Sequence, residues 1–228
     1  MSARPASRAL IFVSGWGAHG SEWLTTPLWK GAAAAGWTVH RLSGRTTGES
    51  IDDSSQRLVE LVGTLRSDHD QVAVVGHSLG GLVAERADLV DRMDAIVTIA
   101  TPHRGIWGAL LLGWTDMALA RDMVPGSSFL MALRSAPGPR SPLLAIAVRS
   151  DIVVPGNASV PTRAHDALAF AGSHLDVIYR QELADAVFGW LATNDVGPKL
   201  SDNGYRSTTS PASDQPIHKC QLADDARG

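Results

Sequence analysis

A serine flanked by glycines follows an apolar run, in a position typical of a nucleophile. The stretch "VVGHSLGG" at Val74–Gly81 contains the pattern G-x-S-x-G centred on Ser78. The apolar residues before it predict a buried strand, and those after it predict a helix. Such a turn holds the serine in a strained conformation that exposes its hydroxyl, and it needs glycine at Gly76 and Gly80 to avoid backbone collisions. We therefore predict that Ser78 is a nucleophile; the alternative is an ordinary serine at a helix N-terminus.

A serine hydroxyl needs a base to take its proton and an acid to orient that base. For a nucleophile in this kind of turn, the expected chain order is serine, acid, histidine. Asp151 directly follows the apolar run Leu143–Ser150, and His174 lies after the last apolar run. We predict that Asp151 is the acid and His174 the base.

Other acids and histidines remain weaker candidates. We interpret His77 as a packing residue, because a side chain next to Ser78 must point away from it. His165 precedes the last apolar run, which places it at the wrong edge of the sheet. The remaining acids considered were Asp116, Asp122 and Asp176, and the histidines that do not fit the chain order are His19, His40, His69 and His103.

Acyl transfer also needs hydrogen-bond donors for the developing oxyanion. We expect one donor to be the backbone N–H of Leu79 and the other to be that of Trp16, in the loop "SGWGAHG" after the first strand. Gly15 and Gly17 would allow a close approach, and the Trp16 side chain would be free to line an acyl pocket. The alternative for these glycines is a plain strand-to-helix turn.

These residues would be positioned by alternating strands and helices, which predict an α/β fold with a doubly wound, mostly parallel sheet. The expected strands are Ala9–Ser14, Thr38–Leu42, Gln71–His77, Ala95–Ala100, Leu143–Ser150 and Asp166–Gly172. The expected helices are Glu22–Ala35, Ile51–Arg66, Leu79–Val90 and Leu175–Leu191.

We expect one hydrolase domain over residues 1–194 and a polar, flexible tail over 195–228. Within the domain, residues 106–140 contain no expected strand and are rich in Leu, Met, Trp and Ala. They fit either a crossover helix with a long loop or a small helical cap over the carboxyl ends of the strands. In a cap, Trp107, Leu111 and Trp114 would contact an apolar part of the substrate.

Composition excludes several other functions. The formal net charge of -3, without a basic run, argues against nucleic-acid binding. No segment is long enough to be an integral membrane span, and the apolar run Ala9–Val13 is too short for a signal peptide, so we expect a cytoplasmic protein. A single cysteine, Cys220, excludes an intrachain disulfide, and Cys220 and His218 in the tail are too few for a metal site.

Five segments, in order, resemble the α/β-hydrolase family and, within it, the lipase-like serine esterases. "SGWG" resembles the oxyanion loop, although Ser14 stands where that loop more often has histidine. "GHSLGG" resembles the nucleophile elbow. The other three matches are "IATPHRG" after a strand, "DIVVP" at the acid turn and "GSHLDVI" at the histidine loop, and the cap segment "VPGSSFLMAL" is also similar.

The resemblance implies a fold from about Ala9 to Leu191 and hydrolysis without a metal or organic cofactor. Some lipases carry a structural calcium, but no acidic cluster here argues for one. The expected activity is hydrolysis of small-molecule or lipid esters with an apolar acyl part, through an acyl-enzyme. A thioesterase, an acyltransferase and a non-catalytic acyl-binding module on the same fold are the alternatives.

Overall fold

A computed structural model of the chain describes residues 6–42, 49–109, 117–137 and 141–196. Its centre is a six-stranded sheet in the order β2-β1-β3-β4-β5-β6, and every pair of neighbouring strands is parallel. The strands are β1 Arg8–Val13, β2 Thr38–Arg41, β3 Gln71–His77, β4 Ala95–Ile99, β5 Leu143–Val148 and β6 Asp166–Phe170. The predicted doubly wound α/β sheet is confirmed, including the sixth strand.

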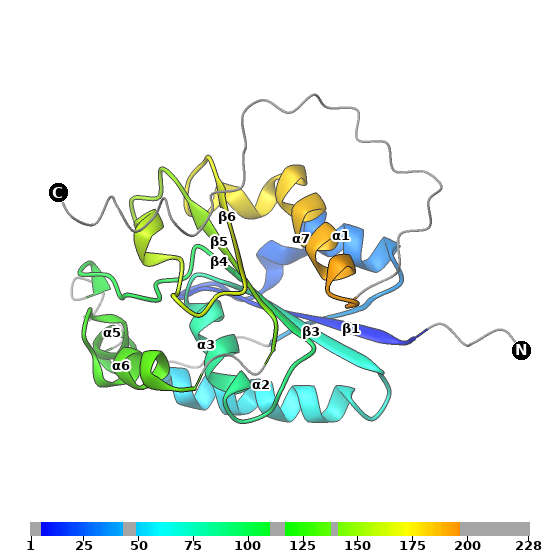
Figure 1. Cartoon of the computed structure of the whole chain (residues 1–228), viewed down its shortest axis with the longest axis horizontal. Coiled ribbons are helices and arrows are strands. Elements are labelled where there is room, and N and C mark those ends of the chain that lie inside the picture. Colours follow the sequence, from blue (N-terminus) through cyan, green and yellow to red (C-terminus); the bar gives the residue numbers. More distant parts are fainter. Residues whose placement is uncertain (1–5, 43–48, 110–116, 138–140, 197–228) are drawn as a thin grey trace, which may run out of the picture.

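Helices cover both faces of the sheet, as Figure 1 shows. On one face lie α1 (Pro27–Ala34) and α7 (Gln181–Thr193), and on the other lie α2 (Ile51–Leu65) and α3 (Leu79–Asp88). Each face has its own apolar core, in which buried side chains of the strands pack against the helices. The central strands are almost fully apolar because both of their faces are covered.

The order of the strands reverses between β1 and β3, since the chain places β2 on one side of β1 and all later strands on the other. In open parallel sheets, ligands bind beyond the carboxyl ends of the strands at such a reversal. Ser78 follows β3 directly, and the loop containing Gly15 and Trp16 follows β1. The sheet topology therefore brings these two segments to the edge where a ligand site is expected.

Two helices that we expected to be continuous are each divided. The segment predicted as Glu22–Ala35 forms a 3-10 helix, η1 (Ser21–Thr25), and then α1. Pro27 disfavours a helical conformation at the residue before it, and Thr26 is extended, with its hydroxyl accepting a hydrogen bond from the Trp29 backbone N–H at 3.2 Å.

The segment predicted as Leu175–Leu191 is also divided. It forms a 3-10 helix, η3 (Asp176–Tyr179), then extended Arg180, and then α7. Val177 and Ile178 of η3 are buried against the sheet. This short helix begins two residues after His174, so packing against the sheet fixes the end of the loop that carries His174.

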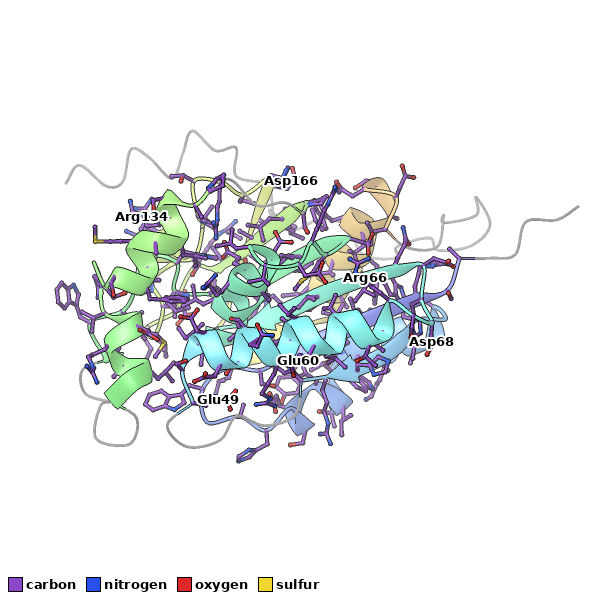
Figure 2. All side chains as sticks on the ribbon, turned by 90° about the horizontal axis from the view of Figure 1, so that it is seen from below. Glu49, Glu60, Arg66, Asp68, Arg134 and Asp166 are labelled. Atoms are coloured by element: carbon purple, nitrogen blue, oxygen red, sulfur yellow. The ribbon has the colours of Figure 1, made fainter. Side chains whose placement is uncertain are left out.

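Two short helices, α5 (Met117–Met123) and α6 (Ser128–Ser135), lie in the segment that we considered as a cap. Figure 1 shows them side by side at one end of the molecule, on the same side of the sheet as α2 and α3. Figure 2 shows this side from below, with Arg134 on α6, and with Glu49 before the start and Asp68 beyond the end of α2. Phe129, Leu130 and Leu133 of α6 are buried in the core on that side.

Candidate active site

Ser78 occupies a sharp turn between β3 and α3. Its backbone angles, φ 53° and ψ -123°, lie in a region that residues with a side chain rarely adopt. A Cβ atom on Gly76 would overlap the backbone of Gly80 and Gly81, and one on Gly80 would overlap the backbone of Val13. The predicted need for small residues at Gly76 and Gly80 is thus a consequence of close backbone contacts between β1, β3 and α3.

The structure brings Ser78, His174 and Asp151 together from three separate segments. The Ser78 Oγ lies 3.0 Å from His174 Nε2, and His174 Nδ1 lies 2.6 Å from Asp151 Oδ2. The Asp151 side chain is fully buried, whereas 11% of the His174 side chain is exposed. The order of contacts, hydroxyl to imidazole to carboxylate, is the one needed for an imidazole to take the proton of a serine.

The turn after β5 fixes the Asp151 carboxylate. One oxygen, Oδ1, accepts hydrogen bonds from the backbone N–H groups of Val153 and Val154, at 2.8 and 2.9 Å. The other oxygen is therefore directed to His174. Burial alone would raise the pKa of Asp151, but the hydrogen bonds from His174, Val154 and Val153 outweigh burial and hold its pKa below the ordinary value. Asp151 is thus a carboxylate at neutral pH.

His77 does more than pack, which is an aspect that sequence reasoning missed. Its buried imidazole lies 4.9 Å from that of His174 between ring centres, and its Nε2 lies 2.8 Å from the His174 carbonyl oxygen. Burial, followed by the proximity of His174, lowers the pKa of His77 to about 4. His77 is therefore neutral at neutral pH. It contacts the backbone of His174, the residue whose side chain contacts Ser78.

The weaker candidates lie away from Ser78 or have other partners. His165 Nδ1 accepts a hydrogen bond from the Leu143 N–H at the first residue of β5, the opposite end of that strand from Asp151, as expected. Asp176 accepts hydrogen bonds from the Ser173 backbone and hydroxyl. Asp122 lies in α5, and Asp116 falls outside the described residues.

The predicted oxyanion donors lie beside Ser78. Leu79 is the first residue of α3, where backbone N–H groups have no partner within the helix. Gly15 is so close that a Cβ atom there would lie 3.0 Å from the Ser78 Cβ, and Trp16 is the next residue. Ser14, at the position where the resembled family more often has histidine, accepts a hydrogen bond from Trp23 Nε1 at 3.1 Å.

Of the residues predicted to contact substrate, Trp107 is described and is 69% exposed. It lies in the loop between β4 and α5, so it is not buried against the sheet. Leu111 and Trp114 lie outside the described residues, as does the tail from residue 197.

A buried charged cluster, which sequence reasoning also missed, is centred on α3. Glu85 of α3 forms an ion pair with Arg163, and its Oε1 lies 2.6 Å from His103 Nδ1. Only 1% of the Glu85 side chain is exposed. Arg163 also donates a hydrogen bond to the Leu133 carbonyl of α6, at 2.8 Å. The cluster therefore links α3 to the loops after β4 and before β6 and to the end of α6. The available signal was Glu85 itself, an acid that directly follows the apolar run Leu82–Ala84.

We expect Glu85→Gln to lower the free energy of unfolding by about 3–5 kcal/mol, because it leaves the Arg163 charge buried without its partner. Arg86→Gln is the matched control. It removes a charge from the next residue of α3, whose pair with Asp52 is half exposed and is worth about 0–1 kcal/mol. Urea unfolding of both variants measures the difference; equal, small losses would contradict the assigned importance of the buried cluster.

The same variant should change the acid sensitivity of folding. Burial opposes ionisation of Glu85, but His103 and Arg163 outweigh it and lower its pKa. Because the folded pKa lies below the unfolded one, the stabilisation is complete above the ordinary pKa and is lost as pH falls through the folded value. The difference between wild type and Glu85→Gln should therefore shrink on acidification below about pH 4.5.

Two further searches concern only the part of the chain that the structure describes. Within residues 6–42, 49–109, 117–137 and 141–196, no group of three or more His, Cys, Asp or Glu side chains could hold a metal ion. Over the same ranges, every helix is too short or too polar to cross a membrane.

Comparison with known proteins places this geometry in a family. The family model described as "Alpha/beta hydrolase family" matches residues 10–216. No curated protein matches the sequence.

Similar solved structures include two lipases. Lipase BlEst2 from Bacillus licheniformis, in its mature form, has a TM-score of 0.67 at 16% identity, over 83% of this chain and 94% of that one. The monoacylglycerol lipase of Paleococcus ferrophilus has a TM-score of 0.64 at 16% identity, over 83% and 97%. BpoC of Mycobacterium tuberculosis, a candidate non-heme bromoperoxidase, has a TM-score of 0.65 at 16% identity, over 84% and 94%. At these identities the structures share the fold, and the family model supplies the assignment: the chain belongs to the alpha/beta hydrolase family.

Proposed function

We propose that the protein is a serine hydrolase that cleaves carboxylic esters through an acyl-enzyme. The observation that carries the proposal is the continuous chain of contacts from the Ser78 hydroxyl through His174 to the buried Asp151 carboxylate, at 3.0 and 2.6 Å. Ser78 has a backbone conformation that is rare for a residue with a side chain, and Asp151 is a buried acid; both features are typical of functional sites.

In the proposed reaction, His174 Nε2 takes the proton of Ser78 as Oγ attacks the ester carbonyl carbon. Asp151 keeps the Nδ1 proton of His174 in place and stabilises the imidazolium that forms. His174 then gives its proton to the leaving alcohol, and the acyl group remains on Ser78. In the second half, His174 activates a water that attacks the acyl-enzyme, and the acid product leaves with Ser78 restored.

The backbone N–H groups of Leu79 and Trp16 are the proposed donors to the oxyanion. Leu79 lies at the N-terminus of α3, where the helix dipole also favours negative charge. Trp16 follows Gly15. Because Gly15 lies close to Ser78, the Trp16 backbone N–H would lie near the attacked carbonyl. Donors of this kind typically contribute about 3–4 kcal/mol each to lowering the barrier.

We propose an apolar acyl group for the substrate, in a small-molecule or lipid ester. Trp107 lies exposed beyond β4, and the neighbouring sequence from Leu110 to Trp114 is rich in leucine and tryptophan. Two of the structures that share the fold are lipases, which accords with this substrate class. Rates on p-nitrophenyl esters of increasing chain length, with and without an emulsion, measure the preference for the acyl group.

A fluorophosphonate probe tests the proposed function directly. We expect the folded protein to be labelled on Ser78, as found by mass spectrometry of its peptides, because His174 activates that hydroxyl. His174→Ala should prevent labelling. Labelling of a residue other than Ser78 would contradict the proposal. A folded protein that is not labelled and hydrolyses no ester would also contradict it and would favour a non-catalytic binding module.

A further inference from the structure

We infer that His77 is a positioning residue, which holds the main chain of His174 in place through a hydrogen bond to its carbonyl oxygen. The inference rests on the proposed function, because it concerns the residue assigned as the base. His77 is the last residue of β3, directly before Ser78, whereas His174 lies 97 positions after it in a loop.

The contact fixes the protonation of His77. A carbonyl oxygen only accepts hydrogen bonds, so Nε2 of His77, 2.8 Å from the His174 oxygen, must carry the proton. With its pKa lowered to about 4, the ring is neutral and its Nδ1 has no proton. A neutral donor suits this place, because His174 becomes positively charged during the proposed reaction and a second charge 4.9 Å away would oppose that step.

His174 is thereby held at two points. Asp151 holds the Nδ1 end of the ring, and His77 holds the backbone carbonyl of the same residue. The residues on either side of His174, Ser173 and Leu175, are exposed, and the buried residues that anchor the end of this loop begin at Val177. The rigid strand β3 carries both Ser78 and His77, so the His77 contact ties the base to the same element that carries the nucleophile. A shift of about 1 Å at a catalytic group can cost about 100-fold in rate.

The matched pair His77→Gln and His77→Met tests the hydrogen bond. The two side chains have similar lengths, but only glutamine has an N–H donor near the position of Nε2. We expect His77→Gln to keep kcat within about threefold of wild type, and His77→Met to lower kcat by about 10- to 100-fold with a smaller change in KM. All rates are normalised to the serine that the fluorophosphonate probe titrates.

A control separates positioning from stability. Val75 is buried two residues before His77 on the same face of β3, and Val75→Ala should lower stability without lowering kcat of the folded protein. Wild-type kcat in His77→Met, or equal losses in the glutamine and methionine variants, would overturn the inference.

A spectroscopic measurement on the wild-type protein does not depend on how the variants fold. ¹⁵N NMR of the imidazoles should show His77 as the Nε2–H tautomer between about pH 5 and 8. An Nδ1–H tautomer would overturn the inference. If Ser78→Ala keeps full activity, the proposed function fails while the tautomer of His77 is still measured; if only the His77 results fail, the proposed function stands.

Discussion

Replacing Ser78 with alanine is expected to lower kcat for ester hydrolysis by about 10⁶-fold, the loss that follows when a serine nucleophile is removed from a triad that works as a unit. Alanine keeps the Cβ atom that lies close to Gly15 and removes only the Oγ that contacts His174. The turn should therefore keep its geometry, and the free energy of unfolding should change by about 1 kcal/mol or less. Steady-state rates on a p-nitrophenyl ester and urea unfolding measure the two effects.

Ser135→Ala is the matched control. Ser135 is exposed on α6 and donates only to the Ala132 carbonyl of its own helix, so its loss should leave kcat unchanged. More than about 1% residual activity in purified Ser78→Ala would contradict its assignment as nucleophile. Loss of activity together with loss of the folded state would instead assign Ser78 a structural role.

Much of the fold was predictable because it depends on local patterns. Strands covered on both faces are nearly continuous apolar runs, and all six expected strands are present. The expected order of chain segments then placed Asp151 and His174 after β5 and β6, where the structure brings them to Ser78. Their catalytic roles stay predictions until the variants are measured.

The divided helices mark different limits of sequence reasoning. The break before Pro27 had a local signal, since proline restricts the residue before it, and that signal was given too little weight. The break at Arg180 has no proline or glycine. It depends on the burial of Val177 and Ile178 against the sheet, a tertiary contact that helical periodicity does not report.

The contacts of His77 and Glu85 could not be predicted for a related reason. The partner of His77 is a backbone carbonyl, which has no signature in the side chains of the sequence. The partners of Glu85 lie 18 and 78 positions away, in loops whose course depends on the whole sheet. Sequence reasoning therefore identifies candidate catalytic side chains more readily than the side chains that position them.

Replacing Asp151 with asparagine should lower kcat by about 10⁴-fold without unfolding the protein. Asp151 Oδ1 accepts two backbone N–H groups, from Val153 and Val154, and only an oxygen can keep both bonds. The asparagine oxygen is therefore expected to take that place, which turns the NH₂ group toward His174. That group would donate to Nδ1, so the neutral imidazole would carry its proton on Nε2, facing Ser78.

An imidazole with its proton on Nε2 cannot accept the proton of Ser78, which is why a substitution of one atom should be so costly. Rates on the same ester measure the loss, and ¹⁵N NMR should show His174 change from the Nδ1–H to the Nε2–H tautomer. Asp176→Asn is the matched control, because Asp176 lies two residues from His174 but is half exposed and pairs with Ser173 and Arg180. Its variant should keep kcat within about threefold.

The two asparagine variants together decide which carboxylate orients the base. If Asp176→Asn loses the greater part of the activity and Asp151→Asn keeps it, the acid has been assigned wrongly. If Asp151→Asn is inactive but His174 keeps its Nδ1 proton, the carboxylate acts by stabilising the charged imidazole rather than by fixing its tautomer. The buried position of Asp151 and its two backbone donors favour the tautomer effect, because they leave the asparagine amide a single orientation.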